Sequence, residues 1–265
     1  MNGSAHPAMA TNTVQSAQPR WLVAYAREAQ AEVLKLWRQP AFLYPTLAFP
    51  ALFYLLFGVV MARGPNTGDV ARYMLATYAV FGAMGPALFG FGVGLAEERG
   101  NGLLDLKRVL PLPPMAYLVA KTLMAMAFAL FIGALLLLLA MAVGGVRLPL
   151  ASIICYFAVL TFGALPFAAL GLLIGCLMRA QAATAIVQMI YLPLGFLGGL
   201  WFPIFKLPKV LQAIAVFLPS YHFGQLNLWA VGIESIFPWI SLLALGAFAL
   251  VFLALAASAW RRMEM

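Results

Sequence analysis

Long stretches without a charged side chain restrict this chain more than any other feature of its sequence. A Lys, Arg or Asp at the centre of a membrane-spanning helix costs about +2.5 to +3.5 kcal/mol on insertion scales. Charge-free stretches of roughly 20 residues therefore mark helices that can cross a ~30 Å hydrocarbon core. Such stretches occupy 39–62, 73–96, 122–146, 148–178, 180–205, 210–233 and 235–260. The chain is expected to fold in lipid.

The composition supports this expectation and excludes other classes of protein. The chain is 65% hydrophobic and 9% charged, whereas a soluble domain is about half apolar and about a quarter charged. The same hydrophobicity excludes a disordered chain. The net charge of +8 does not indicate a nucleic-acid partner, because the sixteen basic residues are dispersed and form no continuous basic face. We conclude that this is an integral membrane protein.

The sixth charge-free stretch, 210–233, differs from the others because it is rich in polar groups. Its polar and helix-breaking residues are Gln212, Pro219, Ser220, His222, Gln225 and Asn227. A helix facing lipid would expose these groups, so this stretch is expected to enter the membrane and return on the same side. The fold class predicted is an all-α membrane protein with six spanning helices and an outer re-entrant segment at 202–231. The residues predicted to form an outer gate there are Pro203, Pro208, Pro219 and His222.

The distribution of basic residues predicts the orientation of the six spans. With a cytoplasmic N-terminus, eleven basic residues fall in inner segments and five in outer segments, in agreement with the positive-inside bias. The inner residues are Arg20, Arg27, Lys35, Arg38, Arg99, Lys107, Arg108, Lys121, Arg179, Arg261 and Arg262. A seventh span would move Arg261 and Arg262 outside. We therefore expect a multi-pass protein of the cell's inner (cytoplasmic) membrane with both termini in the cytoplasm.

The N-terminal part of the chain precedes the first span and divides into two segments. Residues 1–19 are small and polar without an apolar core, which predicts a disordered cytoplasmic tail and excludes a signal peptide. Residues 20–38 have helical periodicity, with one apolar face and with Arg20, Arg27, Lys35 and Arg38 on the opposite face. Such a segment is typical of a helix lying flat in the headgroup layer. The alternative is a soluble helix packed on another subunit.

The inner loop at 97–121 holds more charge than any other segment. Leu103, Leu106 and Leu110 share a helical stripe that ends at Pro111. A solvated connector needs no leucine stripe, so the pattern favours a short amphipathic helix that docks on a partner. The chain has no nucleotide-binding sequence of the Walker type. If an energy source docks at this loop, it must be another polypeptide.

The predicted spans offer little chemistry for catalysis. None has an Asp, Glu or His in its interior, whereas intramembrane enzymes and ion-coupled transporters need such groups. His222 beside Ser220 lacks an orienting carboxylate, and polar capping is the favoured role for it. Cys155 and Cys176 would lie roughly 31 Å apart in one continuous helix, too far for a disulfide. We expect no metal site and no enzymatic activity in this chain.

A group of aromatic, methionine and glutamine side chains is the candidate lining of a substrate path. These residues are Tyr78, Phe81, Met84, Phe89, Gln188, Met189 and Tyr191. The same residue types also pack ordinary helix interfaces, and that alternative stays open. If they line a path, the path suits hydrophobic or amphiphilic cargo.

The loop after the second span resembles a motif of the permease subunits of type-2 ATP-binding cassette (ABC) exporters. That motif reads E-R-E-x-G-T-x-E-x-L, followed by a proline and, ten residues later, a lysine. Glu98 and Arg99 match its opening pair, Gly102 its glycine, Asp105 its second acid and Pro111 its proline. Lys121 follows ten residues after that proline. Gly100 and Leu103 depart from the pattern.

Further segments extend the resemblance over nearly the whole chain after residue 20. The stretch LWRQPAFLYPTLAFPALFYLLFG resembles the start of the family's first span, and GFLGGLWFPIFKLPKVLQAIAVFLPSYH resembles its late motif. In the late motif a usual serine is replaced by Gly198. The resemblance implies a six-span permease domain at 39–262.

The resemblance also implies partners and a division of labour. Two permeases, as a homodimer or heterodimer, would pair with two cytoplasmic ATPase subunits, which would bind ATP and Mg. The segment 97–114 would be the coupling helix that docks on the ATPase. The cargo is expected to be hydrophobic, drug-like or lipidic. The alternatives are a polysaccharide exporter, an intramembrane enzyme or a stand-alone channel.

Overall fold

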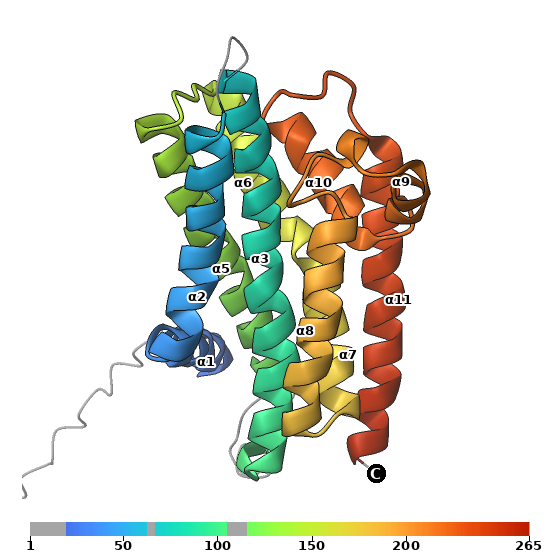
Figure 1. Cartoon of the computed structure of the whole chain (residues 1–265). Helices are drawn as coiled ribbons and strands as arrows, with labels where there is room; N and C mark the ends of the chain where they lie inside the picture. Colours follow the sequence, from blue (N-terminus) through green and yellow to red (C-terminus); the bar gives the residue numbers. More distant parts are fainter. Residues whose placement is uncertain (1–19, 63–66, 105–115, 265) are drawn as a thin grey trace, which may run out of the picture.

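The computed structural model describes residues 20–62, 67–104 and 116–264, and these residues form a bundle of helices (Figure 1). Six of the described helices are long and apolar enough to cross a membrane: Pro40–Val60, Thr67–Gly100, Ala116–Ala142, Leu150–Leu177, Ala180–Leu197 and Trp239–Arg262. The prediction of an all-α membrane protein with six spans is confirmed. The predicted tail at 1–19 and most of the predicted coupling helix lie outside the described residues.

Each span corresponds to one or two labelled helices. Span 1 is α2 (Pro40–Phe53) continued by a π-helical segment, η1 (Tyr54–Val60). Spans 2 and 3 are α3 (Thr67–Gly100) and α5 (Ala116–Ala142). Span 4 consists of α6 (Leu150–Gly163) and α7 (Leu165–Leu177). Spans 5 and 6 are α8 (Ala180–Leu197) and α11 (Trp239–Glu264).

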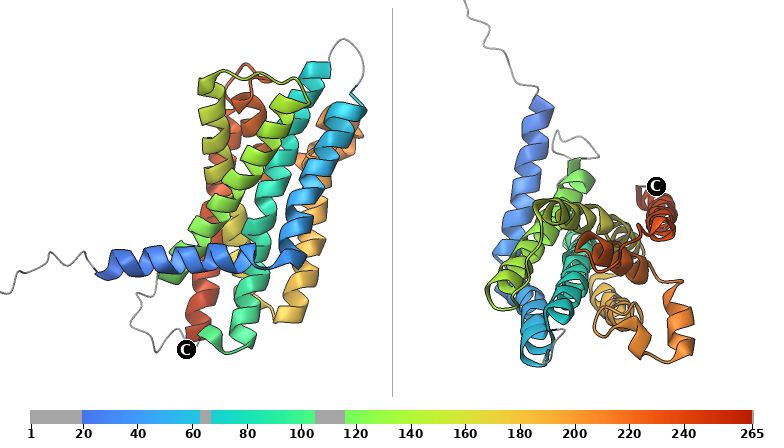
Figure 2. Two further views of the ribbon diagram at one scale, coloured as in Figure 1. Left: turned by 90° about the vertical axis from the view of Figure 1, so that its left-hand side faces the viewer. Right: turned by 90° about the horizontal axis from the view of Figure 1, so that it is seen from above.

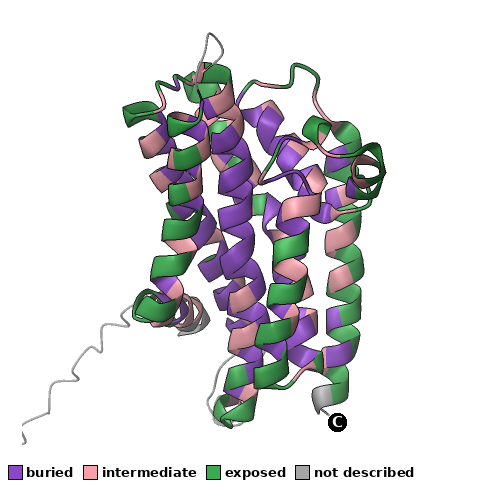
Figure 3. Ribbon diagram, in the orientation of Figure 1, coloured by how far each residue is buried: buried purple, intermediate pink, exposed green. Residues whose placement is uncertain are grey.

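The helix α3 forms the core of the bundle. In the 18-residue apolar stretch of α3, 83% of the residues are buried. In the corresponding stretches of spans 1 and 6, 17% of the residues are buried (Figure 3). Glycines allow α7 to approach it closely, since a Cβ atom on Gly171 would lie 2.9 Å from the Ala87 carbonyl oxygen and one on Gly175 would lie 2.8 Å from that of Phe91. Small residues at four-residue spacing permit such contact between helices in lipid.

Span 4 is broken where a continuous helix was expected. The helix α6 ends at Gly163, and α7 begins at Leu165, after one intervening residue and with Pro166 in its first turn. Proline has no N–H to continue the hydrogen-bond ladder and is favoured at a helix start, which explains the break. Cys155 and Cys176 therefore lie on different helices, and both are free thiols.

The first helix, α1 (Arg20–Trp37), lies crosswise beside the bundle near one of its ends, and α3, α8 and α11 extend past it (Figure 2). It packs on α5, and Leu36 is buried while Trp37 is exposed. The helix predicted at 20–38 is thus present, and it packs on its own chain. One expectation is wrong: Lys35 does not share the outward orientation of Arg27 and Arg38, because its ammonium group bonds to Glu98 of α3.

The segment between α8 and α11 stays at the end of the bundle opposite α1 (Figure 1). It contains a short 3₁₀ turn, η2 (Ile204–Lys206), and the helices α9 (Lys209–Ala215) and α10 (Pro219–Ala230). Neither α9 nor α10 is among the six candidate spans. The choice of six spans over seven is therefore confirmed.

Candidate functional site

Two adjoining cavities lie between the α1–α2 junction, α3 and α8. The larger, of about 680 Å³, is lined by charged and polar side chains together with apolar ones. The smaller, of about 450 Å³, is lined mainly by aromatic and aliphatic side chains. The residues that line both are Ala41, Phe42, Phe89 and Gln188. The two cavities therefore lie directly side by side and share part of their lining, and the polarity of the lining changes from one to the other.

Aromatic rings build the wall of the smaller cavity, which we call the apolar cavity. Phe81 and Tyr191 stack with ring centroids 4.5 Å apart, and Phe89 meets Tyr191 edge-on at 5.7 Å. The hydroxyl groups on this wall already have partners within the protein. Tyr191 donates to the Phe81 carbonyl oxygen at 3.0 Å, and Thr46 donates to that of Phe42 at 2.7 Å. The cavity thus offers rings and aliphatic groups, with few polar groups available to a guest.

The structure distributes the predicted path residues over three environments. Phe81, Phe89, Gln188 and Tyr191 line the apolar cavity. Tyr78 and Met84 are fully buried, and the Tyr78 hydroxyl donates to the Trp201 carbonyl oxygen at 3.1 Å. Met189 is 75% exposed on the outside of α8. Helical periodicity explains the separation, because side chains one residue apart point about 100° away from each other.

The larger cavity, which we call the polar cavity, has a buried ion cluster at its wall. The Lys121 ammonium group of α5 lies 2.9 Å from Glu32 of α1 and 3.2 Å from Glu98 of α3. Glu98 also pairs with Lys35. Exposed fractions are 1% for Lys121, 4% for Glu32 and 2% for Glu98. Because buried charges persist only when paired, this cluster joins three helices at one end of the bundle.

Sequence reasoning found part of this cluster and missed the rest. Glu98 and Lys121 both match the family's motif, but nothing in that pattern indicates that the two side chains form an ion pair. Sequence reasoning did not identify Glu32, whose partner lies 89 residues further along the chain. A usable signal was present, since Glu32 lies next to Val33 and one turn before Leu36 on the side of the helix expected to be apolar. An acid in such a position needs a buried cation.

The residues that match the coupling motif make contacts within the chain where the structure describes them. The Arg99 guanidinium donates to the carbonyl oxygens of Cys176 and Met178, at the C-terminal end of α7. A cation is favoured there because it complements the helix dipole and the unpaired carbonyls. Gly102 follows the end of α3 with φ of +71°, a conformation that favours glycine. Asp105 and Pro111 lie outside the described residues, so the coupling role stays a prediction.

The predicted outer-gate residues have identifiable structural positions. Pro203 and Pro208 precede η2 and α9, and Pro219 begins α10. His222 is buried, with Nδ1 3.2 Å from the Ser241 hydroxyl and Nε2 2.9 Å from the Val216 carbonyl oxygen. Nε2–H therefore donates to Val216 and Nδ1 accepts from Ser241. Burial lowers the pKa of His222, which keeps the ring neutral.

Neutral hydrogen bonds attach α10 to the spans around it. The Asn227 side-chain amide donates to the Ala76 carbonyl oxygen of α3 at 2.8 Å, and the Ser220 hydroxyl donates to that of Leu194 of α8 at 2.7 Å. A Cβ atom on Gly198 would lie 2.3 Å from the Ser220 oxygen. The glycine that replaces the family's usual serine thus leaves room for a serine hydroxyl from α10.

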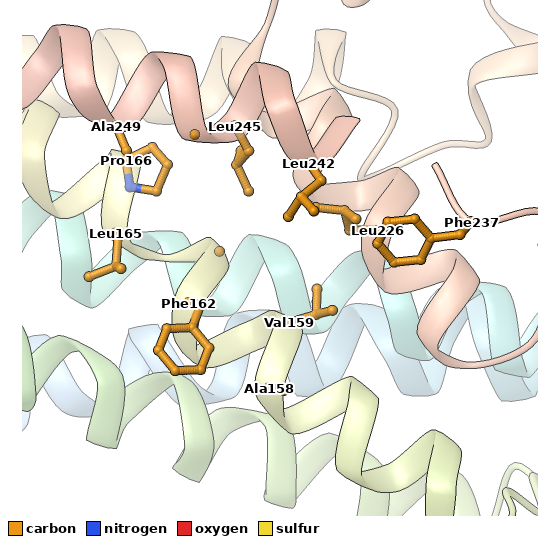
Figure 4. Close-up of a pocket in the computed structure, with 12 residues that line it drawn as sticks. Ala158, Val159, Phe162, Leu165, Pro166, Leu226, Phe237, Leu242, Leu245 and Ala249 are labelled. Carbon is orange, nitrogen blue, oxygen red and sulfur yellow. The ribbon is translucent and has the colours of Figure 1, made fainter. Parts of the chain in front are cut away.

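A third cavity, of about 330 Å³, lies where span 4 is broken. Figure 4 shows Phe162 of α6, Pro166 of α7 and Leu245 of α11 around it, with Leu226 of α10 and Phe237 at one end. It shares no lining residue with the polar and apolar cavities. Its side chains carry no hydrogen-bonding group. The predicted path residues therefore belong to the other two cavities.

The part of the chain that the structure describes contains no group of three or more His, Cys, Asp and Glu side chains placed to hold a metal ion. The ionisable side chains around the polar cavity are engaged mainly with one another.

Comparison with known proteins agrees with this arrangement. Residues 27–231 match the family described as ABC-2 type transporter, and the chain belongs to that family. It is therefore a transmembrane subunit of an ABC transporter, and the family associates with an ABC ATPase. The chain is also similar to a Bacillus subtilis (strain 168) protein named as a transport permease, YvfS. The two are 29% identical over 239 residues, which cover 90% of this chain and 97% of that protein.

Proposed function

We propose that this chain is the transmembrane subunit of an ATP-driven exporter for hydrophobic, drug-like or lipidic cargo. The observation that carries the proposal is the pair of adjoining cavities, whose apolar part has its hydroxyl groups already satisfied. A site built to bind sugars needs available donors and acceptors, since their hydroxyl groups lose water on binding. The lining therefore supports apolar cargo over polysaccharide.

The orientation that fits this function has α1 and both termini in the cytoplasm, in the inner membrane. The described ends of the chain lie at the same end of the bundle (Figure 1). Exposed Arg27, Arg38, Arg261 and Arg262 also gather there, in keeping with the positive-inside bias. The polar cavity would then face the cytoplasm, where an exporter takes up its cargo.

Coupling to ATP hydrolysis would pass through the segment 97–114. Its first residues belong to α3, the helix that lines both cavities. Glu98 and Arg99 connect that end of α3 to α1, α5 and α7. A movement of this segment that the ATPase causes would therefore be transmitted to α3, α1, α5 and α7. ATP and Mg²⁺ would be held by the ATPase, with this chain binding neither.

A homodimer with two ATPase subunits is the assembly that the surface of the chain supports. Tyr44 and Leu52 of α2 and Met189 of α8 are between 62% and 75% exposed, and both helices also contribute to the lining of the apolar cavity. A second copy that covers this face would close the cavities into a path between the protomers. Met189 would then line the path, as its sequence position predicts.

The proposal is tested by purification and transport. The tagged chain, purified from its native membrane in mild detergent, should carry an ATP-binding subunit, and cross-linking should give a permease dimer. In inside-out proteoliposomes the complex should take up a lipophilic dye only with ATP and Mg²⁺. Purification without an ATPase, together with dye movement that needs no ATP, would exclude the exporter and favour a channel.

A variant in the 97–114 segment tests coupling to the ATPase without altering the residues that line the cavities. Asp105→Lys should reduce ATPase association or uncouple hydrolysis from dye uptake, because a docking surface is sensitive to charge reversal. Asp69→Lys, at the opposite end of α3, is the matched control. Unchanged transport in both variants would refute the coupling role of the 97–114 segment.

A further inference from the structure

We infer that the adjoining cavities bind a zwitterionic amphiphile, with its head in the polar cavity and its tail in the apolar cavity. This inference rests on the proposed function and names the class of cargo more narrowly. Three observations carry it: the charges that remain after the buried cluster has neutralised itself, the change of polarity along α3, and the position of α1.

The charge balance identifies the head group. Lys121 and Lys35 are matched by Glu32 and Glu98 through direct ion pairs, so these four side chains form a neutral set. Two other charged side chains line the polar cavity: Arg38 at the end of α1 and Glu97 at the end of α3. Both are exposed, and neither has an ion-pair partner within the described part of the chain.

One cation and one anion, from two different segments of the chain, complement a head that carries one charge of each sign. A purely anionic head would meet Glu97, and a purely cationic head would meet Arg38. Gln39 and Gln188 supply neutral amides at the same cavity. The wall thus discriminates by charge sign as well as by polarity.

The positions along α3 give the dimensions of the guest. From Glu97 to Phe89 and from Phe89 to Phe81 are eight residues each, or roughly 12 Å each at the helical rise. The first interval borders the polar cavity and the second borders the apolar cavity. The apolar volume of about 450 Å³ lies within the usual range for small-molecule pockets. A compact head with a tail of about ten ångströms or more fits this division.

The location of α1 explains how such a molecule would enter. This helix lies crosswise to the spans (Figure 2), as a helix in the headgroup layer would. Residues of its last turn line the polar cavity. A lipid-like guest could therefore move sideways from the adjacent leaflet while its head stays at headgroup depth. Its tail would pass directly into the apolar cavity, so neither part would cross an unfavourable environment.

Three amphiphiles that share the same dodecyl tail but differ in the charge of the head group test the inference. Dodecylphosphocholine is zwitterionic, dodecyl phosphate anionic and dodecyltrimethylammonium cationic. Binding of each radiolabelled compound to the purified full chain in maltoside detergent is measured by equilibrium dialysis, below its own micellar concentration. We expect the zwitterion to bind most tightly. Equal affinity for all three compounds would overturn the inference.

Neutralising Arg38 and neutralising Glu97 should change the preference among the three head groups in opposite directions. Arg38→Gln should weaken binding of the phosphocholine and phosphate compounds about fivefold, and Glu97→Gln should do the same for the phosphocholine and ammonium compounds. Fivefold corresponds to the upper range for exposed ion pairs. Arg27→Gln, an exposed position on α1 that does not line the cavity, changes the net charge equally and should leave the preference unaltered.

A second variant tests the tail. Gly85 lines the apolar cavity and a Cβ atom there would meet Tyr191 only at 3.4 Å, so Gly85→Leu projects into the space. It should weaken binding of all three amphiphiles by a similar factor. If head variants have no effect while this one does, the cavity is merely hydrophobic and the zwitterionic assignment is wrong. Because binding is measured on the chain alone, failure here leaves the ATPase complex and dye uptake as separate tests of the proposed function.

Discussion

At the end of the bundle where α1 lies, charges join the helices: Lys121 holds Glu32 and Glu98, and Arg99 binds the last carbonyls of α7. At the opposite end, α10 is attached by neutral groups, with Asn227 and Ser220 donating to backbone carbonyls of α3 and α8. Ion clusters lose much when one member is removed, whereas a neutral hydrogen bond contributes about 1 kcal/mol. Removing one partner is thus expected to destabilise the fold more at the charged end than at the α10 end.

The largest effect is expected from removing the central cation. Lys121→Met should lower the free energy of unfolding by about 3–5 kcal/mol, because Glu32 and Glu98 are left buried without their shared partner. Thermal unfolding in nonionic detergent can be followed with a thiol-reactive dye, since Cys176 is buried in the fold. Adding Glu32→Gln and Glu98→Gln to the variant should recover part of the loss. An unchanged unfolding temperature for Lys121→Met would remove the distinction between the two ends.

A smaller loss is expected where α10 meets the break in span 4. A Cβ atom on Gly163 would lie 2.2 Å from the Phe223 ring, so Gly163→Ala should cost about 1–3 kcal/mol through overpacking. In a Phe223→Leu background the same change should cost much less. A double-mutant cycle measures this coupling directly. Equal costs in both backgrounds would show that α10 does not press on α6 at this point.

A single neutral hydrogen bond should matter less again. Asn227→Leu removes the 2.8 Å bond to Ala76 and should cost about 1 kcal/mol, since the Ala76 carbonyl lies inside a helix that continues beyond it. Gln225→Leu, on the same helix but half-buried, is the control and should be close to neutral. A loss as large as that of Lys121→Met would mean that the α10 end is held as firmly as the charged end.

The smallest effect is a dependence on pH at the α10 end. Burial lowers the pKa of His222, so the unfolded chain binds a proton more readily than the folded chain. Stability should therefore be constant above about pH 6.5, the ordinary histidine value, and fall as the pH drops below it. Unfolding temperatures at pH 7.5 and 5.5 measure this change, and His222→Gln should reduce it. An identical pH dependence in the variant would assign the effect to other groups.

Much of the fold followed from local features of the sequence. Charge-free stretches predicted the six spans, and the polar residues between 210 and 233 excluded a seventh. The motif residues Glu98 and Lys121 were recognised separately, without any indication that they meet. Of the path residues, Phe81, Phe89, Gln188 and Tyr191 line one cavity, whereas Met84 is packed inside the bundle. Residue type could not separate these cases, because apolar side chains suit both a core and a path.

The sequence by itself determined which segments lie in the membrane, because the cost of placing a charge in hydrocarbon belongs to each residue regardless of its neighbours. Only the tertiary structure decided which helix faces meet. It joined Glu32 to Lys121 across 89 residues, set α10 against the break at Gly163, and left Arg38 and Glu97 facing one cavity. Such pairings depend on how helices rotate and cross, which is set by the packing of all their side chains together and not by the periodicity of any one helix.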